Sequence, residues 1–286
     1  MNPIRIGIRD SGAGGLTVAR RLREQIPNAQ LLYFADTAHV PYGEKSVAQI
    51  QHYALSISDF LIQKGAQIIV FACNTTSAVA LDAARERFSA PVFGVIQPGA
   101  RGAALVSRAK IGVLATAATV SSRVYTREIA ALRPELQTLE VACPAFVPLV
   151  EAHQTDSLQA RQACQEYLQP LLDFGADTVV LGCTHFPLLL APLQELAPHI
   201  QFIDPADALA GEVAATLLNS TTAEEKSSLI APIPQKMKRA LLIEENAEAP
   251  RDIFWVSGTR DGFEEWIRTL LAIEKPDLQS GPIFDL

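Results

Sequence analysis

GAQIIVFACNT at residues 65–75 is repeated as GADTVVLGCTH at residues 175–185, with an offset of 110 residues at every position. Each copy begins with a Gly-Ala turn, continues through apolar and β-branched residues, and ends on a cysteine, Cys73 or Cys183. A continuous apolar run of this length is typical of a parallel strand that is buried on both faces. A polar turn and then a helical pattern follow each cysteine. The repeat therefore predicts two strands that each place a thiol at the start of a helix.

A second repeat supports the first. KIGVLAT at residues 110–116 resembles RIGIRDS at residues 5–11, here with an offset of 105 residues. We therefore expect an α/β fold of two pseudo-symmetric domains with mostly parallel sheets and an active site in the cleft between them. The first, discontinuous domain is expected at residues 1–97 with 208–286, and the second at residues 98–207. A crossing point is expected near residues 97–100, and residues 219–250 are interpreted as a surface excursion or linker.

Periodicity and turn residues predict the remaining elements. Strands are expected at residues 5–9, 30–35, 91–96, 110–116, 137–142, 201–203 and 252–257. Helices are expected at residues 16–25, 46–64, 78–88, 155–173, 188–197, 207–218 and 263–273.

Composition limits the class of protein. The 286 residues are 49% hydrophobic and 19% charged, which is typical of a globular chain with a sizeable core. No stretch approaches the roughly 18 apolar residues of a membrane span, and a strand begins too early to leave room for a signal peptide. The four cysteines are scattered rather than spaced as a disulfide framework, so a cytoplasmic protein is expected. A net charge of −7 argues against nucleic acid as the main partner.

The positions of the two repeated cysteines suggest a function. Ligands bind at the carboxyl ends of parallel strands, and a helix N-terminus favours anions, so a thiol placed there is expected to ionise more easily than usual. A single unpaired cysteine is more often a small buried hydrophobe, but the repetition favours a functional role for Cys73 and Cys183. Cys143 and Cys164 have no polar turn beside them and are interpreted as structural.

A glycine-rich turn at residues 10–15 follows the first strand and invites comparison with phosphate-binding loops. Its spacing is not G-x-G-x-x-G, no Lys-Ser/Thr pair follows, and the acidic residue at its front would repel phosphate. Asp10 and Ser11 suit a ligand with an ammonium group, or an acid–base role for Asp10. The alternative, that Asp10 caps the following helix, is left open by the local sequence. Local sequence also leaves open whether Glu151 is an ordinary surface residue.

Several motifs together carry a family resemblance. In chain order they are Asp10-Ser11-Gly12 with Gly14-Gly15-Leu16, Tyr33-Phe34-Ala35-Asp36-Thr37, Val40-Pro41-Tyr42-Gly43-Glu44-Lys45-Ser46, Ala72-Cys73-Asn74-Thr75-Thr76, Ala115-Thr116 with Thr119, Cys143-Pro144 through Glu151, and Leu181-Gly182-Cys183-Thr184-His185-Phe186-Pro187-Leu188. With them the chain resembles the glutamate racemases of the cofactor-independent aspartate/glutamate racemase superfamily, over about residues 4–218 and again near Phe254. It departs from the family pattern at Arg9, where an apolar residue is usual, at Asp204-Pro205-Ala206, and in residues 219–250.

The resemblance implies interconversion of L- and D-glutamate without pyridoxal phosphate, metal or nucleotide, to supply D-glutamate for peptidoglycan. Inverting a carbon acid requires a base on one face and a proton donor on the other, and two thiols meet that demand. The residue at Cys73 is expected to deprotonate the D-isomer and that at Cys183 the L-isomer. Asp10, His185 and Glu151 complete the expected catalytic set. The expected substrate-binding residues are Asp10, Ser11, Pro41, Tyr42, Gly43, Asn74, Thr75, Thr76, Thr116, Thr119, Thr184 and His185.

Other possibilities remain open at this level. A cysteine–His185 metal site lacks the Cys-x₂-Cys pairing of zinc sites, so no metal is expected. The protein could be a racemase of another acidic amino acid such as aspartate, or a two-lobed binding or regulatory protein without catalysis. A decarboxylase is not expected, because relatives that decarboxylate have a single thiol and this chain has both. A homodimer that closes on its substrate is expected. Some relatives act on DNA gyrase, but this sequence gives no support for that interaction.

Overall fold

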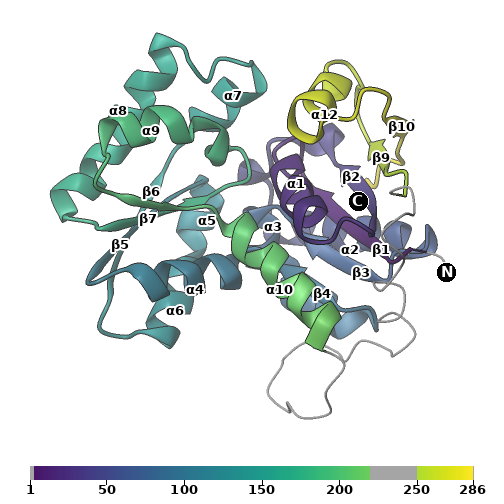
Figure 1. The fold of residues 1–286 in the computed structure, drawn as a ribbon, viewed down its shortest axis with the longest axis horizontal. Helices are drawn as coiled ribbons and strands as arrows, with labels where there is room; N and C mark the ends of the chain where they lie inside the picture. Colours follow the sequence, from purple (N-terminus) through teal and green to yellow (C-terminus); the bar gives the residue numbers. More distant parts are fainter. Residues whose placement is uncertain (1–2, 220–249, 286) are drawn as a thin grey trace. The chain divides into compact units, whose positions relative to one another are not determined.

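The computed structural model describes residues 3–219 and 250–285. The predicted surface excursion at 219–250 therefore lies, but for its two end residues, outside the described residues. The chain divides into two compact units, the first drawn from Met1–Gly94 and Leu209–Leu286 and the second from Val95–Ala208. Each unit is built on a parallel sheet with helices on both faces, which confirms the predicted α/β class (Figure 1).

The first unit contains a six-stranded parallel sheet in the order β10-β9-β2-β1-β3-β4. Its strands are β1 (Arg5–Asp10), β2 (Gln30–Ala35), β3 (Ile68–Phe71), β4 (Val92–Gly94), β9 (Ile253–Val256) and β10 (Asp277–Ser280). Three strands lie side by side at its centre, with Arg9 of β1 opposite both Phe34 of β2 and Phe71 of β3. Residues that follow β1, β2 and β3 therefore share one edge of the sheet.

Helices cover both faces of this sheet. The helices of this unit are α1 (Leu16–Gln25), α2 (Val47–Gln63), α3 (Asn74–Arg87) and α12 (Phe263–Leu271), with short 3₁₀ turns η1 (Thr37–His39) and η2 (Tyr42–Glu44). Helices α1 and α12 pack together on one face, and α2 and α3 on the other (Figure 1). Helix α2 begins at Ser46, whose side chain and Gln49 form a reciprocal capping box. Helix α10 (Pro205–Asn219) begins in the second unit and ends in the first.

The second unit has a four-stranded parallel sheet in the order β6-β5-β7-β8. Its strands are β5 (Lys110–Ala115), β6 (Gln137–Ala142), β7 (Thr178–Gly182) and β8 (Gln201–Ile203). Its helices are α4 (Ile96–Val106), α5 (Ala117–Ser122), α6 (Val124–Leu132), α7 (Phe146–Glu151), α8 (Leu158–Phe174) and α9 (Leu190–Leu196), with the 3₁₀ turn η3 (Phe186–Leu189). Helices α4 and α6 pack together on one face, and α8 and α9 on the other (Figure 1).

The two units repeat one another in topology and in detail. Strands β2-β1-β3-β4 of the first unit have the same order and direction as β6-β5-β7-β8 of the second. The turn before each cysteine strand is also the same, because Gly65 and Gly175 both have positive φ, at 93° and 80°. Each closes the preceding helix with a bond from its own N–H and one from the next residue, all at 2.9 Å. Glycine is needed here because the left-handed conformation strains other residues.

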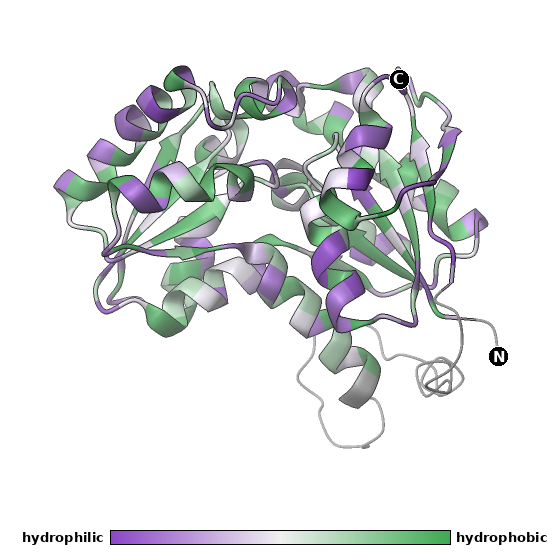
Figure 2. Ribbon diagram, turned by 45° about the horizontal axis from the view of Figure 1, so that its top comes forward, coloured by the Kyte–Doolittle hydropathy of each residue, from purple (hydrophilic) through white to green (hydrophobic). Residues whose placement is uncertain are grey.

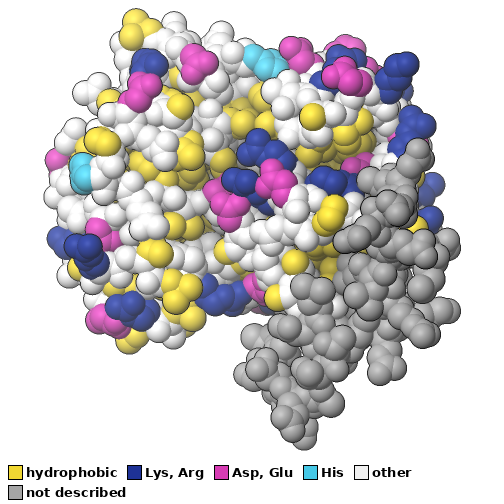
Figure 3. Space-filling view, in the orientation of Figure 1, with side chains coloured by type: hydrophobic (Ala, Val, Ile, Leu, Met, Phe, Trp, Pro, Cys, Tyr) yellow, Lys and Arg dark blue, Asp and Glu magenta, His cyan; other side chains and the backbone are white. Residues whose placement is uncertain are grey.

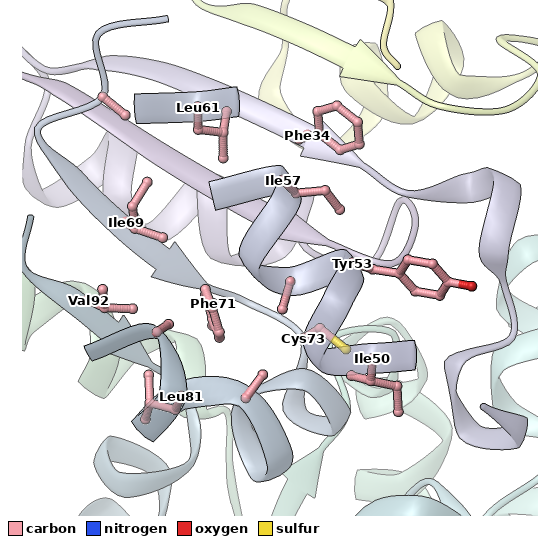
Figure 4. Close-up of a cluster of buried hydrophobic side chains, with 14 of the residues drawn as sticks. Phe34, Ile50, Tyr53, Ile57, Leu61, Ile69, Phe71, Cys73, Leu81 and Val92 are labelled. Atoms are coloured by element: carbon pink, nitrogen blue, oxygen red, sulfur yellow. The ribbon is translucent and has the colours of Figure 1, made fainter. Parts of the chain in front are cut away.

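The core of the first unit lies between the sheet and helices α2 and α3. A cluster of buried side chains there includes Phe34, Phe71, Tyr42, Tyr53 and Cys73. Figure 4 shows Cys73 beside Ile50, just beyond Phe71 at the end of β3. Most strand positions are hydrophobic, whereas the helices carry both hydrophobic and hydrophilic positions, as expected for sheets covered on both faces (Figure 2). Cys73 therefore stands where the apolar core meets the polar edge of the sheet.

Several elements of the structure differ from those expected from the sequence. The expected crossing point at residues 97–100 lies in the first turn of α4, where a proline at the third helical position is tolerated. Helix α3 begins at Asn74 rather than near residue 78. Residues 143–151, read as an apolar segment, contain α7, and the tail forms a further strand, β10.

The charges on the surface and the lengths of the helices indicate which partners the protein could contact. On the face drawn in Figure 3, Lys and Arg side chains lie among Asp and Glu side chains. Among the helices of the described residues, none combines the length and the apolar character needed to cross a membrane.

Candidate active site

The carboxyl edge of the first sheet gathers the predicted polar residues of this unit. Asp10 ends β1, Asp36 follows β2, and Cys73 follows β3 by two residues. Cys73 is the N-cap residue of α3, with extended backbone angles of −66° and 123°. The prediction of a thiol at a helix start is therefore confirmed for Cys73.

The Asp10 carboxylate organises the glycine-rich turn. Its Oδ2 accepts hydrogen bonds from the backbone N–H groups of Gly12 and Gly15, both at 3.1 Å. The N-cap of α1 is Gly15, so Asp10 is not the capping residue, and its carboxylate binds the turn that precedes the helix rather than the N–H groups of the first helical turn. A Cβ on Gly15 would lie 2.5 Å from Asp10 Cβ and 2.6 Å from the Tyr33 hydroxyl. The turn thus holds a fully buried carboxylate beside Cys73, with Ser11, half-buried, as the next residue.

The Cys73 thiol is harder to ionise than the sequence suggested. Burial, together with the negative charge of Asp10, raises its pKa above the ordinary value. Arg9 opposes this rise through its positive charge, and Thr76 opposes it through hydrogen bonds from its side chain and its backbone. The expectation of easier ionisation at the helix start is therefore wrong for Cys73, because desolvation outweighs the favourable end of the helix.

The first turn of α3 carries the predicted polar side chains. Asn74, Thr75 and Thr76 are all buried in that turn rather than in a loop. The first N–H groups of a helix have no partner within the helix, so this turn offers backbone donors as well as hydroxyl and amide groups. Such a set of neutral dipoles can bind a carboxylate.

Hydrogen bonds hold the Pro-Tyr-Gly loop, residues 41–43, to the carboxyl edge of the sheet. The Tyr42 hydroxyl donates to Asp36 Oδ2 at 2.5 Å and accepts from Arg9 Nη2 at 2.8 Å. The other Asp36 oxygen accepts from Ser257 Oγ at 2.7 Å, and His39 Nδ1 lies 2.9 Å from both oxygens. The Tyr42 hydroxyl is thus committed to protein partners. The backbone hydrogen bonds of η2 are donated by Glu44 and the residue after it, and not by Tyr42 or Gly43, which precede them. A ligand could therefore be bound by backbone N–H groups of this loop, next to the exposed Pro41.

Sequence reasoning noted Arg9 as a departure from the family pattern but assigned it no role. In the structure it is fully buried, and among the described residues it is the largest such side chain. It binds Thr76 and Tyr42 and lies over the rings of Tyr42 and Phe71, with 5.3 Å and 5.6 Å to their centroids. An arginine inside the buried strand β1, where the family pattern has an apolar residue, was the available signal.

The corresponding edge of the second sheet holds the second thiol. Cys183 directly follows β7, and the neighbouring strand β5 leads into Thr116. Thr116 is the N-cap residue of α5, and its Oγ1 lies 3.1 Å from Thr119 Oγ1. Unlike Cys73, Cys183 is followed by a turn and then the 3₁₀ segment η3, so the predicted helix start is not repeated here. Thr184, the next residue, is buried.

Cys183 belongs to a chain of three polar side chains. Its Sγ lies 3.7 Å from His185 Nδ1, and His185 Nε2 lies 2.6 Å from Glu151 Oε1. Burial alone would lower the pKa of His185, but the hydrogen bonds to Cys183 and Glu151, and their negative charges, raise it well above its ordinary value. A thiol, an imidazole and an orienting carboxylate in this order form an arrangement that can move a proton to and from sulfur. Glu151, which local sequence left undecided, is brought to His185 by α7.

The other two cysteines have different surroundings. Both are buried, and burial raises the pKa of Cys143 far above its ordinary range and that of Cys164 to about 11. Thiols held neutral in this way behave as small apolar side chains, in line with their predicted structural role.

The comparisons with known proteins agree on one family. The model of the Asp/Glu/hydantoin racemase family matches residues 16–213. The glutamate racemase of Desulforudis audaxviator is 47% identical over 205 residues, which are 71% of this chain and 75% of that protein. The crystal structure of glutamate racemase isoform RacE1 from Bacillus anthracis has a TM-score of 0.85 at 31% identity, covering 99% of both chains. Glutamate racemase from Francisella tularensis, solved with D-glutamate, has a TM-score of 0.84 at 28% identity, again over 99% of both chains.

The chain therefore belongs to the Asp/Glu/hydantoin racemase family, a class of isomerases that act on amino acids and related compounds. Within that family it groups with the glutamate racemases.

Proposed function

We propose that this protein interconverts L- and D-glutamate by proton transfer at Cα, with Cys73 and Cys183 as the two bases. One thiolate takes the Cα proton and becomes a thiol, while the other thiol delivers a proton to the opposite face and becomes a thiolate. The enzyme then stands ready for the reverse direction. Cys73 would take the proton of D-glutamate and Cys183 that of L-glutamate.

The observation that supports this proposal most strongly is that each thiol has its own acid–base surroundings. Cys183 has His185, held by Glu151 at 2.6 Å, which can hold and return the thiol proton. Cys73 has Asp10, whose negative charge is among the causes of its raised pKa. A more basic thiolate is a stronger base towards a carbon acid, so a raised pKa is compatible with this role as long as some thiolate forms.

The polar residues at the two sheet edges would hold the substrate. In the first unit these are Ser11, Asn74, Thr75 and Thr76 with the backbone of Pro41, Tyr42 and Gly43, and in the second unit Thr116, Thr119, Thr184 and His185. Hydroxyl, amide and N–H donors can fix both carboxylates and stabilise the charge that grows on the α-carboxylate as the proton leaves. Asp10 would attract the ammonium group. No cofactor takes part in this scheme.

The biological role follows from the product. We propose that D-glutamate made here supplies peptidoglycan synthesis in the cytoplasm, and that the enzyme acts as a homodimer. The glutamate racemase of Francisella tularensis was solved in complex with D-glutamate, which supports glutamate as the small-molecule partner. An interaction with DNA gyrase has no observation in its favour.

The test is racemisation by the purified protein without added cofactor, followed by chiral chromatography from each enantiomer of glutamate. Cys73→Ala and Cys183→Ala are each expected to lose activity by about 100-fold or more, because each removes one base. Cys164→Ala is the matched control, since it removes a buried cysteine without a proposed catalytic role, and it should stay active. Binding of glutamate by calorimetry without racemisation would favour a binding protein. Racemisation of aspartate but not glutamate would keep the mechanism and overturn the substrate.

A further inference from the structure

Arg9 places a positive charge beneath the first unit's polar edge. Its guanidinium donates from Nη1 to Thr76 Oγ1 and from Nη2 to the Tyr42 hydroxyl, and it is fully buried. Thr76 lies in the first turn of α3, and Tyr42 in the Pro-Tyr-Gly loop. One side chain of β1 thus ties together two segments that are proposed to bind the substrate.

The direction of these bonds determines where the Thr76 proton points. A guanidinium has only donors, so Thr76 Oγ1 must be the acceptor from Arg9. The single hydroxyl proton of Thr76 is then free for another acceptor, and the Thr76 side chain hydrogen bonds to Cys73. The backbone N–H of Thr76 also bonds to Cys73. Arg9, Thr76 and Cys73 therefore form a chain in which Arg9 donates to Thr76 and Thr76 donates to the sulfur.

The charges around this chain have opposite effects on the thiol. Asp10, on the same strand, disfavours the thiolate, and the Asp36 carboxylate adds negative charge to the surroundings of Arg9. Arg9 is the cation that opposes these negative charges. Its Nε is a further donor, and it has no hydrogen-bond partner among the described residues. A buried cation near a thiol lowers the free energy of the thiolate, more so where water is excluded.

We propose that Arg9 is a positioning residue that directs the Thr76 hydroxyl to Cys73 and stabilises its thiolate. This inference rests on the proposed role of Cys73 as a base. A purely structural Arg9 would join the loop to the helix and affect folding stability alone. The two possibilities differ in whether the ionisation of Cys73 depends on Arg9.

The experiment measures the pH dependence of Cys73 alkylation by iodoacetamide, with peptide mass spectrometry to separate Cys73 from Cys183 in the same sample. Arg9→Leu and Thr76→Val are the test variants, and Arg9→Lys is the charge-conserving variant. Arg5→Leu is the matched control, because Arg5 lies on the same strand and bonds to Gln30 and Lys64 instead. Tryptophan fluorescence and circular dichroism verify that each variant is folded.

We expect the Cys73 midpoint to rise by about one pH unit in Arg9→Leu and Thr76→Val, which makes alkylation about tenfold slower below the midpoint. Arg9→Lys should recover most of this shift, and the Cys183 midpoint and the Arg5→Leu profile should not move. A folded Arg9→Leu with an unchanged Cys73 midpoint overturns the proposal. If Arg9→Leu does not fold, an unchanged midpoint in Thr76→Val overturns it instead. If the wild type fails to racemise glutamate, the proposed function fails, while the link between Arg9 and Cys73 is still measured by alkylation.

Discussion

Replacing Tyr42 with phenylalanine removes one buried hydroxyl that bonds to two charged side chains. That hydroxyl accepts from Arg9 at 2.8 Å and donates to Asp36 at 2.5 Å. Burial raises the pKa of Tyr42 well above its ordinary value, so the phenol keeps the proton that it donates. The ring itself stays in place in the variant, so the loss is confined to these two bonds.

The magnitude follows from the partners. A hydrogen bond to a charged group contributes about 1.5–3 kcal/mol, and both partners here are fully buried and would be left with one bond fewer. Two such bonds give an expected loss of about 3–6 kcal/mol in the free energy of unfolding of the first unit. Both tryptophans of the chain, Trp255 and Trp266, lie in this unit. Urea unfolding followed by tryptophan fluorescence therefore reports on it directly.

Tyr53→Phe is the matched control. Tyr53 is buried in the same cluster and stacks on His39 at 3.9 Å, but no hydrogen bond of its hydroxyl is found among the described residues. The free energy of unfolding should fall by no more than about 0.5 kcal/mol in Tyr53→Phe. A Tyr42→Phe variant no less stable than Tyr53→Phe would refute the reasoning, because the hydroxyl would then carry no net stabilisation.

Three further predictions concern the titratable groups. Asp10→Asn removes a negative charge beside Cys73, so the pH midpoint of Cys73 alkylation should fall; a rise would contradict the assigned cause. Glu151→Gln removes a charge that raises the pKa of His185, so the imidazole titration followed by NMR should move to lower pH, and an unmoved titration would argue against the contact. Because His185 has a raised pKa in the folded state, its contribution to stability is fully present below about pH 6.5 and is lost as pH rises through the folded value. His185→Asn should remove that part of the pH dependence of thermal unfolding, and an identical pH dependence in the variant would exclude this linkage.

The sequence was most informative where local patterns repeat. The two cysteine strands, their Gly65 and Gly175 turns and the parallel sheets could be predicted, because an apolar run between a left-handed glycine and a polar cap has few other structures. Strand β10 was missed because DLQS holds no β-branched or aromatic residue, and it forms by pairing with β9. Helix α4 was missed because Pro98 and Gly99 suggest a break, although Gly99 allows close contact with Pro205.

The candidate site shows the same limit. Asp10, Cys73 and Cys183 could be selected from their positions at strand ends. The contact of Glu151 with His185 could not, because it depends on how α7 packs in the second unit. The direction of the Cys73 pKa was also beyond the sequence, since the degree of burial and the charges of Asp10 and Arg9 decide it. The position of a thiol at a helix start predicts only the stabilisation of the thiolate by the helix, and not the cost of removing that thiolate from water.

The central claim is that two different groups remove and deliver the Cα proton. The most direct test incubates L-glutamate with the wild-type protein in D₂O and stops the reaction at low conversion. Deuterium is expected at Cα of the D-glutamate product and almost none in the remaining L-glutamate, because the thiol that takes the proton does not return it. Comparable deuterium in the remaining L-glutamate would mean that one group both removes and returns the proton, and would contradict the two-thiol account.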